Sequence, residues 1–245
     1  MVSILSKITA CKNGIAVLVD PEKFVKTENS LFYEKLKVAQ PNFIFIGGST
    51  VSKKDFDKCV SSLKEKTTIP IVIFPGASHQ IHEAADAILF LSLISGRNPD
   101  FLIGHHIQAA EELENMQIEV ISTSYLLIDG GKKTSVEFVS QTSPVPHDQA
   151  SLARKIALAG KLQGKKLTYL DCGSGAKYSV STSMIEQVKS IHLPLIIGGG
   201  VRDVETIEKM HKAGANIVVI GNRIEEDVDF LLDIANYQRT KHVLA

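Results

Sequence analysis

Two apolar runs near the carboxyl end of the chain each lead into glycine. Leu193–Ile197 precedes Gly198–Gly200, and Ile217–Ile220 precedes Gly221 and Asn222. Glycine lets backbone N–H groups approach a ligand, and the first amides of a following helix are unpaired donors that attract anions. Two such strand ends in succession are typical of the phosphate site of a (β/α)₈ barrel, which is built from the last two strand-to-helix loops. The alternative is that these glycines only form tight turns.

The rest of the chain alternates β-branched apolar runs with amphipathic segments, the pattern of parallel βαβ units. A single (β/α)₈ barrel takes roughly 250 residues, which suits this chain of 245. We therefore predict an α/β fold, one TIM barrel spanning residues 1–245. The predicted strands are Ile15–Val19, Phe43–Ile46, Ile71–Phe74, Ala87–Leu91, Glu119–Leu127, Thr168–Leu170, Leu195–Ile197 and Ile217–Ile220. The predicted helices are Ser30–Val38, Lys53–Lys66, Gly104–Asn115, Asp148–Leu162, Thr182–Ser190, Val204–Ala213 and Glu225–Gln238.

Two segments depart from a regular barrel. Residues 75–86 are few and begin with Pro-Gly, so we expect the third helix to be irregular or missing. Residues 128–146 form an insertion after the fifth strand, in which Asp129-Gly130-Gly131 is typical of a hairpin turn. Because Val136–Val139 alternates as a strand does, we predict a hairpin insertion here.

Charge and cysteine content exclude several classes of protein. The formal net charge is zero and no basic run stands out, so we expect no nucleic-acid partner. Cys11, Cys59 and Cys172 are odd in number and widely spaced, which suits a reducing cytoplasm. We expect neither a signal peptide nor a transmembrane helix, because no apolar run approaches the ~20 residues that span a bilayer.

The first two predicted strands end in groups that could hold a metal ion. Asp20 follows the first strand, and a carboxylate beside an anion site suits Mg²⁺, which takes one or two carboxylates plus substrate oxygens. Its alternative role is a turn before Pro21. Ser49 and Thr50 follow two glycines after the second strand, and their hydroxyls could contact a metal or phosphate or cap a helix.

The sixth predicted strand leads into a segment suited to binding and deprotonating a hydroxylated substrate. Asp171 follows the strand directly, and Tyr169 shares its face because strand side chains alternate. Gly173 and Gly175 open a loop rich in accessible backbone. The alternative is a core tyrosine beside a capping aspartate.

The histidines carry less information. His79 and His82 lack a third ligand at zinc spacing, and His105 and His106 stand at the start of a predicted helix. We interpret all four as polar surface or loop residues.

Eight motifs in order resemble the geranylgeranylglyceryl phosphate synthase family, from about Lys12 to Asp227. They are LVDPEK, IGGST, PGASHQI, FLSLISGRNPDFLIGHH, STSYLLIDGG, YLDCGSGA, IIGGGVRD and VIGN. The chain is similar to the larger of the two groups in that family. No single motif is decisive, but the ordered set is highly specific.

The resemblance implies a prenyltransferase that joins sn-glycerol 1-phosphate to a long prenyl diphosphate, most often geranylgeranyl diphosphate. The products are an ether-linked prenylglyceryl phosphate and diphosphate, and the cofactor is Mg²⁺. The implied metal positions are Asp20 and Ser49, and the implied catalytic positions are Asp171 and Tyr169. The implied substrate positions are Tyr169, Leu170, Asp171, Cys172, Gly173, Ser174, Gly175, Gly199, Gly200, Gly221 and Asn222. The family often has glutamate where this chain has Asp171.

We further expect a cytoplasmic homo-oligomer, a dimer or hexamer, with loose membrane-surface association through its lipid product. Phe90–Ile94 and Phe101–Ile103 are the candidate walls for the prenyl tail. Two alternative functions explain the phosphate loops as well. One is a metal-free isomerase or lyase of sugar-phosphate or amino-acid biosynthesis, and the other is a barrel that binds a phosphorylated ligand without turnover.

Overall fold

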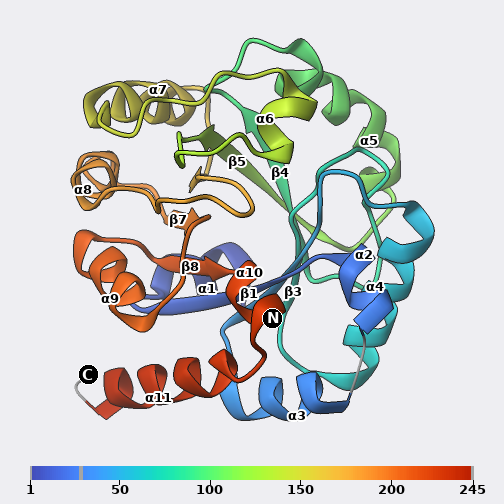
Figure 1. Cartoon of the computed structure of the whole chain (residues 1–245). Helices are drawn as coiled ribbons and strands as arrows, with labels where there is room; N and C mark the ends of the chain where they lie inside the picture. The colour runs from blue at the N-terminus through green and yellow to red at the C-terminus, as the bar shows by residue number, and fades with distance from the viewer. Residues whose placement is uncertain (1, 28–29, 244–245) are drawn as a thin grey trace.

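Eight parallel strands close into a barrel in chain order, with β1 paired to both β2 and β8 (Figure 1). The structure is a computed structural model and describes residues 2–27 and 30–243. The strands are β1 (Gly14–Val19), β2 (Phe43–Ile46), β3 (Ile71–Ile73), β4 (Ala87–Leu93), β5 (Glu119–Leu127), β6 (Leu167–Asp171), β7 (Leu195–Gly198) and β8 (Ile217–Ile220). All eight predicted strands are therefore confirmed, and so is the (β/α)₈ fold.

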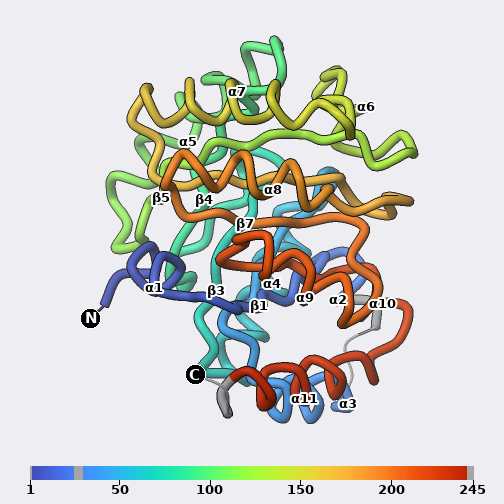
Figure 2. Tube along the Cα trace, turned by 90° about the vertical axis from the view of Figure 1, so that its left-hand side faces the viewer, coloured from blue at the N-terminus to red at the C-terminus, as the bar shows by residue number. Residues whose placement is uncertain are grey.

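Most of the helices form a ring outside the strands (Figure 1). The described helices are α1 (Ile4–Ala10), α2 (Pro21–Thr27), α3 (Ser30–Ala39), α4 (Lys53–Lys66), the π-helical turn η1 (Asp100–Gly104), α5 (His105–Glu114), α6 (Ser135–Ser140), α7 (Ala150–Leu162), α8 (Thr182–Lys189), α9 (Val204–Ala213), α10 (Asn222–Glu226) and α11 (Phe230–Val243). None of the described helices is long and apolar enough to cross a membrane. The first and last large helices, α3 and α11, lie side by side and complete the ring (Figures 1 and 2).

Alternation along the strands divides the apolar residues into two layers. Phe43, Phe45 and Tyr169 pack inside the barrel, whereas Ile44 and Ile46 pack under the helices. Helix α1 covers the amino ends of the strands, since Ile4 and Ile8 join the inner layer. With that end filled by side chains, only the carboxyl ends of the strands remain for a ligand.

The third helix is missing, as the sequence predicts. Residues 74–86, all of which the structure describes, form turns and no helix. The buried side chain of Gln80 orders this segment: its Oε1 accepts from Gly76 N at 3.0 Å, and its Nε2 donates to Gly48 O at 2.8 Å. One amide side chain thus joins the loops after β2 and β3.

The predicted hairpin after β5 is wrong. Residues 135–140 form helix α6, and the insertion meets the sheet only through an isolated bridge between Ile128 and Val145. The Thr134 side chain accepts from Glu137 N, which is the N-cap contact of this helix. This local cap outweighs the strand-like alternation of the segment.

Other helices differ from the prediction as well, and α1 is not among the predicted ones. Pro21 does more than end β1, because it is the first residue of α2. Proline suits this position, since its φ is already helical and the first N–H of a helix has no partner within the helix. The predicted helix Glu225–Gln238 is two helices, α10 and α11, separated where the backbone of Asp227 is extended.

His211 joins α9, β1 and α11 under the helical layer. Its Nε2 lies 3.0 Å from the Gly14 carbonyl oxygen and its Nδ1 lies 2.7 Å from the Tyr237 hydroxyl. A carbonyl can only accept, so Nε2 carries the proton and Nδ1 accepts from Tyr237. Burial of the ring lowers the pKa of His211 to about 4.

This depressed pKa predicts acid sensitivity. The unfolded chain takes up a proton near pH 6.5 whereas the folded chain resists until about pH 4, so stability is full above pH 6.5 and falls across that interval. We expect His211 to account for a loss of about 3 kcal/mol in the free energy of unfolding. Urea unfolding at pH 7 and pH 4.5 measures this difference in the free energy of unfolding. His211→Gln should flatten this pH dependence, whereas His192→Asn, at an exposed histidine, should leave it unchanged.

Candidate active site

One cavity of about 410 Å³ opens at the carboxyl ends of the strands. It brings together nearly all of the predicted site residues. Those lining it are Asp20, Ser49, Tyr169, Asp171, Gly173, Ser174, Gly175, Gly199, Gly200, Gly221 and Asn222. Leu170 and Cys172 are the exceptions, because they alternate with Tyr169 and Asp171 and their side chains pack in the outer apolar layer.

Asp171 is a carboxylate held rigidly at the floor of this cavity. Its Oδ2 accepts from the Tyr125 hydroxyl at 2.7 Å, and its Oδ1 accepts from Gly173 N at 2.9 Å. Only 7% of the residue is exposed, and burial raises the pKa of the carboxyl, while the two hydrogen bonds oppose that rise. A buried carboxylate with a raised pKa is a suitable general base.

Three aromatic rings surround this carboxylate. Tyr169 stacks on Phe74 with ring centroids 4.9 Å apart, and Tyr125 meets Tyr169 edge to face at 5.7 Å. Both tyrosines are buried, and burial with the nearby Asp171 charge raises the pKa of each well above its usual value. They therefore remain neutral hydrogen-bond donors.

The sequence analysis did not identify Tyr125 as a site residue. The signal that could have found it is its place on β5: it is directly opposite Tyr169 in the register of the two strands. Tyrosines paired across parallel strands lie on the same face, so an inward Tyr169 implies an inward Tyr125.

The glycine loops after β6 and β7 are packed against each other. Gly173 and Gly199 have φ values of +78° and +80°, a region that favours glycine. A Cβ on Gly199 would lie 2.7 Å from Gly173 N, and one on Gly200 would lie 2.4 Å from the Tyr178 carbonyl oxygen. Backbone packing therefore requires these glycines, as the turn alternative expects, and their contact with a phosphate stays a prediction.

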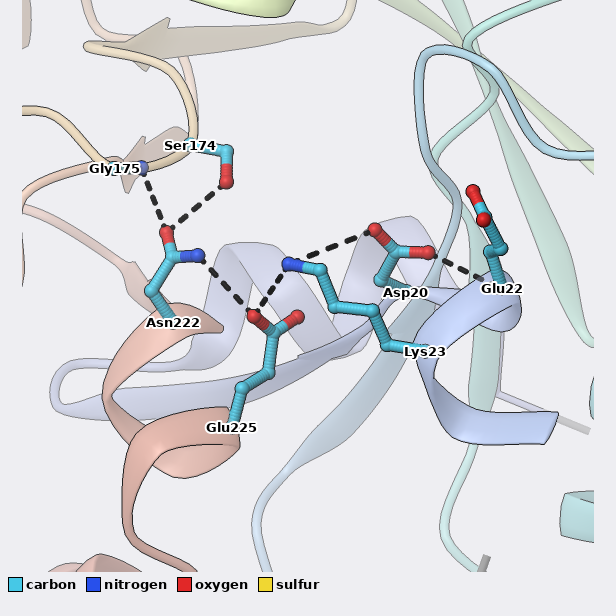
Figure 3. Close-up of polar contacts among 7 residues, drawn as sticks. All are labelled: Asp20, Glu22, Lys23, Ser174, Gly175, Asn222 and Glu225. Atoms are coloured by element: carbon cyan, nitrogen blue, oxygen red, sulfur yellow. Dashed lines mark hydrogen bonds and ion pairs between the residues drawn. The ribbon is translucent and has the colours of Figure 1, made fainter. Parts of the chain in front are cut away.

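Gly221 differs from them. Its φ is −121°, and an added Cβ would only touch the Leu18 side chain at 3.5 Å. Asn222 follows it and holds the loop after β6, since its Oδ1 accepts from Gly175 N at 2.8 Å and from Ser174 Oγ at 3.1 Å (Figure 3). Figure 3 places this amide on α10, across the cavity mouth from Asp20 on the β1 side.

Asp20 makes the turn contact that the sequence offered as an alternative, and its metal role stays a prediction. Its Oδ1 accepts from Glu22 N at 3.0 Å, which caps α2, while Oδ2 lies 3.9 Å from Lys23 Nζ (Figure 3). Its side chain is 30% exposed and lines the cavity with Ser49. Ser49 does not cap a helix, because the cap of α4 is Ser52.

The donors near Asp20 fit magnesium better than a metal held by protein alone. Among the described residues, no group of three or more His, Cys, Asp or Glu side chains could hold a metal ion. One carboxylate with a hydroxyl leaves most coordination positions to water and substrate oxygens, which is how Mg²⁺ binds with phosphates.

One wall of the cavity is apolar. Phe90, Leu91, Leu93 and Phe101 line it, whereas the rest of the predicted tail wall, Ser92, Ile94, Leu102 and Ile103, lines a separate depression. His105 and His106 line the cavity as well, so their interpretation as surface residues is wrong. The π-helical turn places them there: the ring of His106 stacks on Phe90 at 4.1 Å, and its Nε2 lies 2.7 Å from the Leu91 carbonyl oxygen.

Known proteins with the same sequence pattern share this architecture. A geranylgeranylglyceryl phosphate synthase from Zunongwangia profunda is 49% identical over 215 residues, 87% of this chain and 92% of its own length. One from Chitinophaga pinensis is 43% identical, covering 91% of this chain and 89% of its own. The crystal structure of (S)-3-O-geranylgeranylglyceryl phosphate synthase from Thermoplasma acidophilum, in complex with its substrate sn-glycerol-1-phosphate, is 31% identical. It superimposes with a TM-score of 0.87 over 96% of both chains.

The PcrB family matches residues 8–238, which include every strand of the barrel and every residue of the cavity described above. This chain belongs to the PcrB family.

Proposed function

We propose that this protein is a prenyltransferase that joins sn-glycerol 1-phosphate to a long prenyl diphosphate, forming an ether and releasing diphosphate. The observation that carries the proposal is one cavity with three chemistries: glycine loops for a phosphate, a buried carboxylate, and an apolar wall. The glycerol-1-phosphate complex of the Thermoplasma acidophilum relative supports the substrate.

In this proposal the glycine loops hold the phosphate of glycerol phosphate through backbone N–H groups. The glycerol hydroxyls then lie toward Asp171, which the Tyr125 hydroxyl and Gly173 N hold in one orientation. The hydroxyl oxygen forms a bond to prenyl C1 while the bond from C1 to the diphosphate oxygen breaks, and Asp171 takes the hydroxyl proton. Orientation of the two substrates in one cavity lowers the barrier by several kcal/mol.

Magnesium is the proposed cofactor, held by Asp20 and Ser49 with substrate oxygens. When bound, it supplies positive charge that stabilises the departing diphosphate. Asp20 is oriented for this role by its capping bond with Glu22 N, which fixes the carboxylate before any ligand arrives.

The proposed tail site is the wall formed by Phe90, Leu91 and Phe101, with Ala109 and Val136 beside it. It suits a long prenyl chain, and we propose geranylgeranyl as the favoured length. The product would be an amphiphile, so we also propose loose association of the enzyme with membrane surfaces.

We further propose a cytoplasmic homo-oligomer, a dimer or hexamer. Neither Cys11 nor Cys172 forms a disulfide, which supports a reducing compartment. Phe138 on α6 is 85% exposed and its neighbour Val139 is 37% exposed. We propose that subunits meet at this exposed pair of apolar residues.

The test is ether formation from labelled glycerol 1-phosphate with a series of prenyl diphosphates. We expect turnover that EDTA abolishes and Mg²⁺ restores, and loss of at least ~100-fold in kcat for Asp20→Asn with no change in melting temperature. Metal-independent turnover of a sugar phosphate, without ether formation, would instead support an isomerase or lyase. Binding without any turnover would support a regulatory barrel.

The two kinds of glycine give a second prediction. Gly221→Ala should raise the KM for glycerol phosphate several-fold with little change in melting temperature, because its Cβ has room but narrows the approach to the backbone. Gly199→Ala should lower the melting temperature instead, since its Cβ would meet the backbone of the β6 loop at positive φ. Steady-state kinetics with thermal denaturation separates the two effects, and equal effects on both substrates would argue against a phosphate site at Gly221.

Tyr125 gives a third prediction. Its hydroxyl stabilises the ionised form of Asp171, so Tyr125→Phe should raise the pKa of that carboxyl further. The carboxylate must be ionised to accept a proton, and the acid limb of the kcat profile should therefore move to higher pH. Profiles of kcat against pH for wild type and variant measure this.

Variants at Asp171 provide the control for that profile. Asp171→Asn should lower kcat strongly and abolish the acid limb, whereas Asp171→Glu keeps a carboxylate and should retain substantial activity. If Asp171→Asn matches wild type in single-turnover ether formation, then diphosphate or water accepts the proton and Asp171 only positions the glycerol.

A further inference from the structure

A continuous chain of polar contacts runs across the cavity mouth from Asp20 to the loop after β6 (Figure 3). Lys23 Nζ lies 3.9 Å from Asp20 Oδ2 and 2.7 Å from Glu225 Oε2. The same Glu225 oxygen accepts from Asn222 Nδ2 at 3.2 Å. Asn222 in turn accepts from Gly175 N and Ser174 Oγ. These contacts thus join α2, α10 and the β6 loop across the place where β8 pairs with β1.

Glu225 determines which way the Asn222 amide faces. Gly175 N–H can only donate, so the amide oxygen must face the β6 loop, and a carboxylate can only accept, so the amide nitrogen faces Glu225. An amide turned the other way would lose both contacts. Glu225 therefore orders the glycine loop through Asn222, although it does not touch that loop itself.

Lys23 lies between two carboxylates that belong to the two ends of the cavity. Asp20 is on the proposed diphosphate side, and Glu225 leads to the proposed glycerol-phosphate side. An ammonium group this near to Asp20 is also near any phosphate bound there. Because the Lys23 side chain is 51% exposed, its ion pair contributes little to stability, and its effect is expected on ligands rather than on folding.

We propose that Lys23 and Glu225 are positioning residues that couple the two substrate sites, an inference that rests on the proposed function. Diphosphate bound beside Asp20 holds the Lys23 ammonium group where it contacts Glu225. A fixed Lys23 fixes Glu225, and Glu225 fixes Asn222 and the loop of Ser174 and Gly175. The second ligand then finds its site already ordered, which gives positive cooperativity without a change of fold.

Calorimetric titration of glycerol 1-phosphate, with and without inorganic diphosphate and Mg²⁺, tests the proposal. In the wild type we expect diphosphate to lower the Kd for glycerol 1-phosphate about fivefold. Lys23→Met should abolish this difference while leaving the Kd without diphosphate unchanged. Lys23→Arg should restore it, since arginine keeps a cation at this position.

Two variants of Glu225 separate its contacts. Glu225→Gln keeps an oxygen for Asn222 Nδ2 but loses the charge that attracts Lys23, so it should behave like Lys23→Met. Glu225→Ala loses both contacts and should also raise the Kd without diphosphate. The double variant Lys23→Met with Glu225→Gln should show the same loss of the diphosphate effect on Kd as either single variant, because both substitutions remove the same ion pair.

A second ion pair provides the matched control. Glu205 and Lys209 lie 2.7 Å apart on the outer helix α9, so Glu205→Gln should leave the fivefold difference intact. An unchanged difference in Lys23→Met and Glu225→Gln would overturn the coupling while leaving the proposed function in place. If wild-type protein bound no glycerol 1-phosphate at all, the proposed function would fail first and the coupling with it.

Discussion

Closure of the sheet by the pairing of β1 with β8 is the constraint on which the rest of the structure depends. A closed parallel barrel directs all eight carboxyl strand ends to one rim, so residues as distant in sequence as Asp20 and Asn222 line a single cavity. The same closure fills the interior with alternate side chains. Phe45 and Tyr169 occupy that interior. On β6 the cavity begins at Asp171, the last residue of the strand, which lies on the same face as Tyr169.

The burial of the cavity floor follows from this packing. Tyr169 is held between Phe74 and Tyr125, and the Tyr125 hydroxyl has Asp171 within hydrogen-bonding distance. A carboxylate in such surroundings resists ionisation more than one in water, but its two donors keep it oriented. Reactivity and rigidity at Asp171 therefore have the same structural origin, the aromatic layer beneath it.

Long-range order was predictable from the sequence because it depends on hydrophobic period and strand-end chemistry. The eight strands and the missing third helix needed no more than apolar runs and a Pro-Gly start. Local structure was harder to predict. Thr134 caps a helix whose residues alternate as those of a strand do, and the helix that carries His106 follows a π-helical turn. Tyr125 needed the register of β5 against β6, which a single strand does not reveal.

The close approach of Gly199 to the backbone of Gly173 has an evolutionary consequence. Two loops that touch backbone to backbone cannot change independently, since any side chain or insertion in one displaces the other. The end of the cavity that they form is therefore closed to gradual variation. New substrate preferences in such a barrel would arise more readily at α6 and η1, where the side chains of Val136 and Phe101 line the cavity and single substitutions can change its shape.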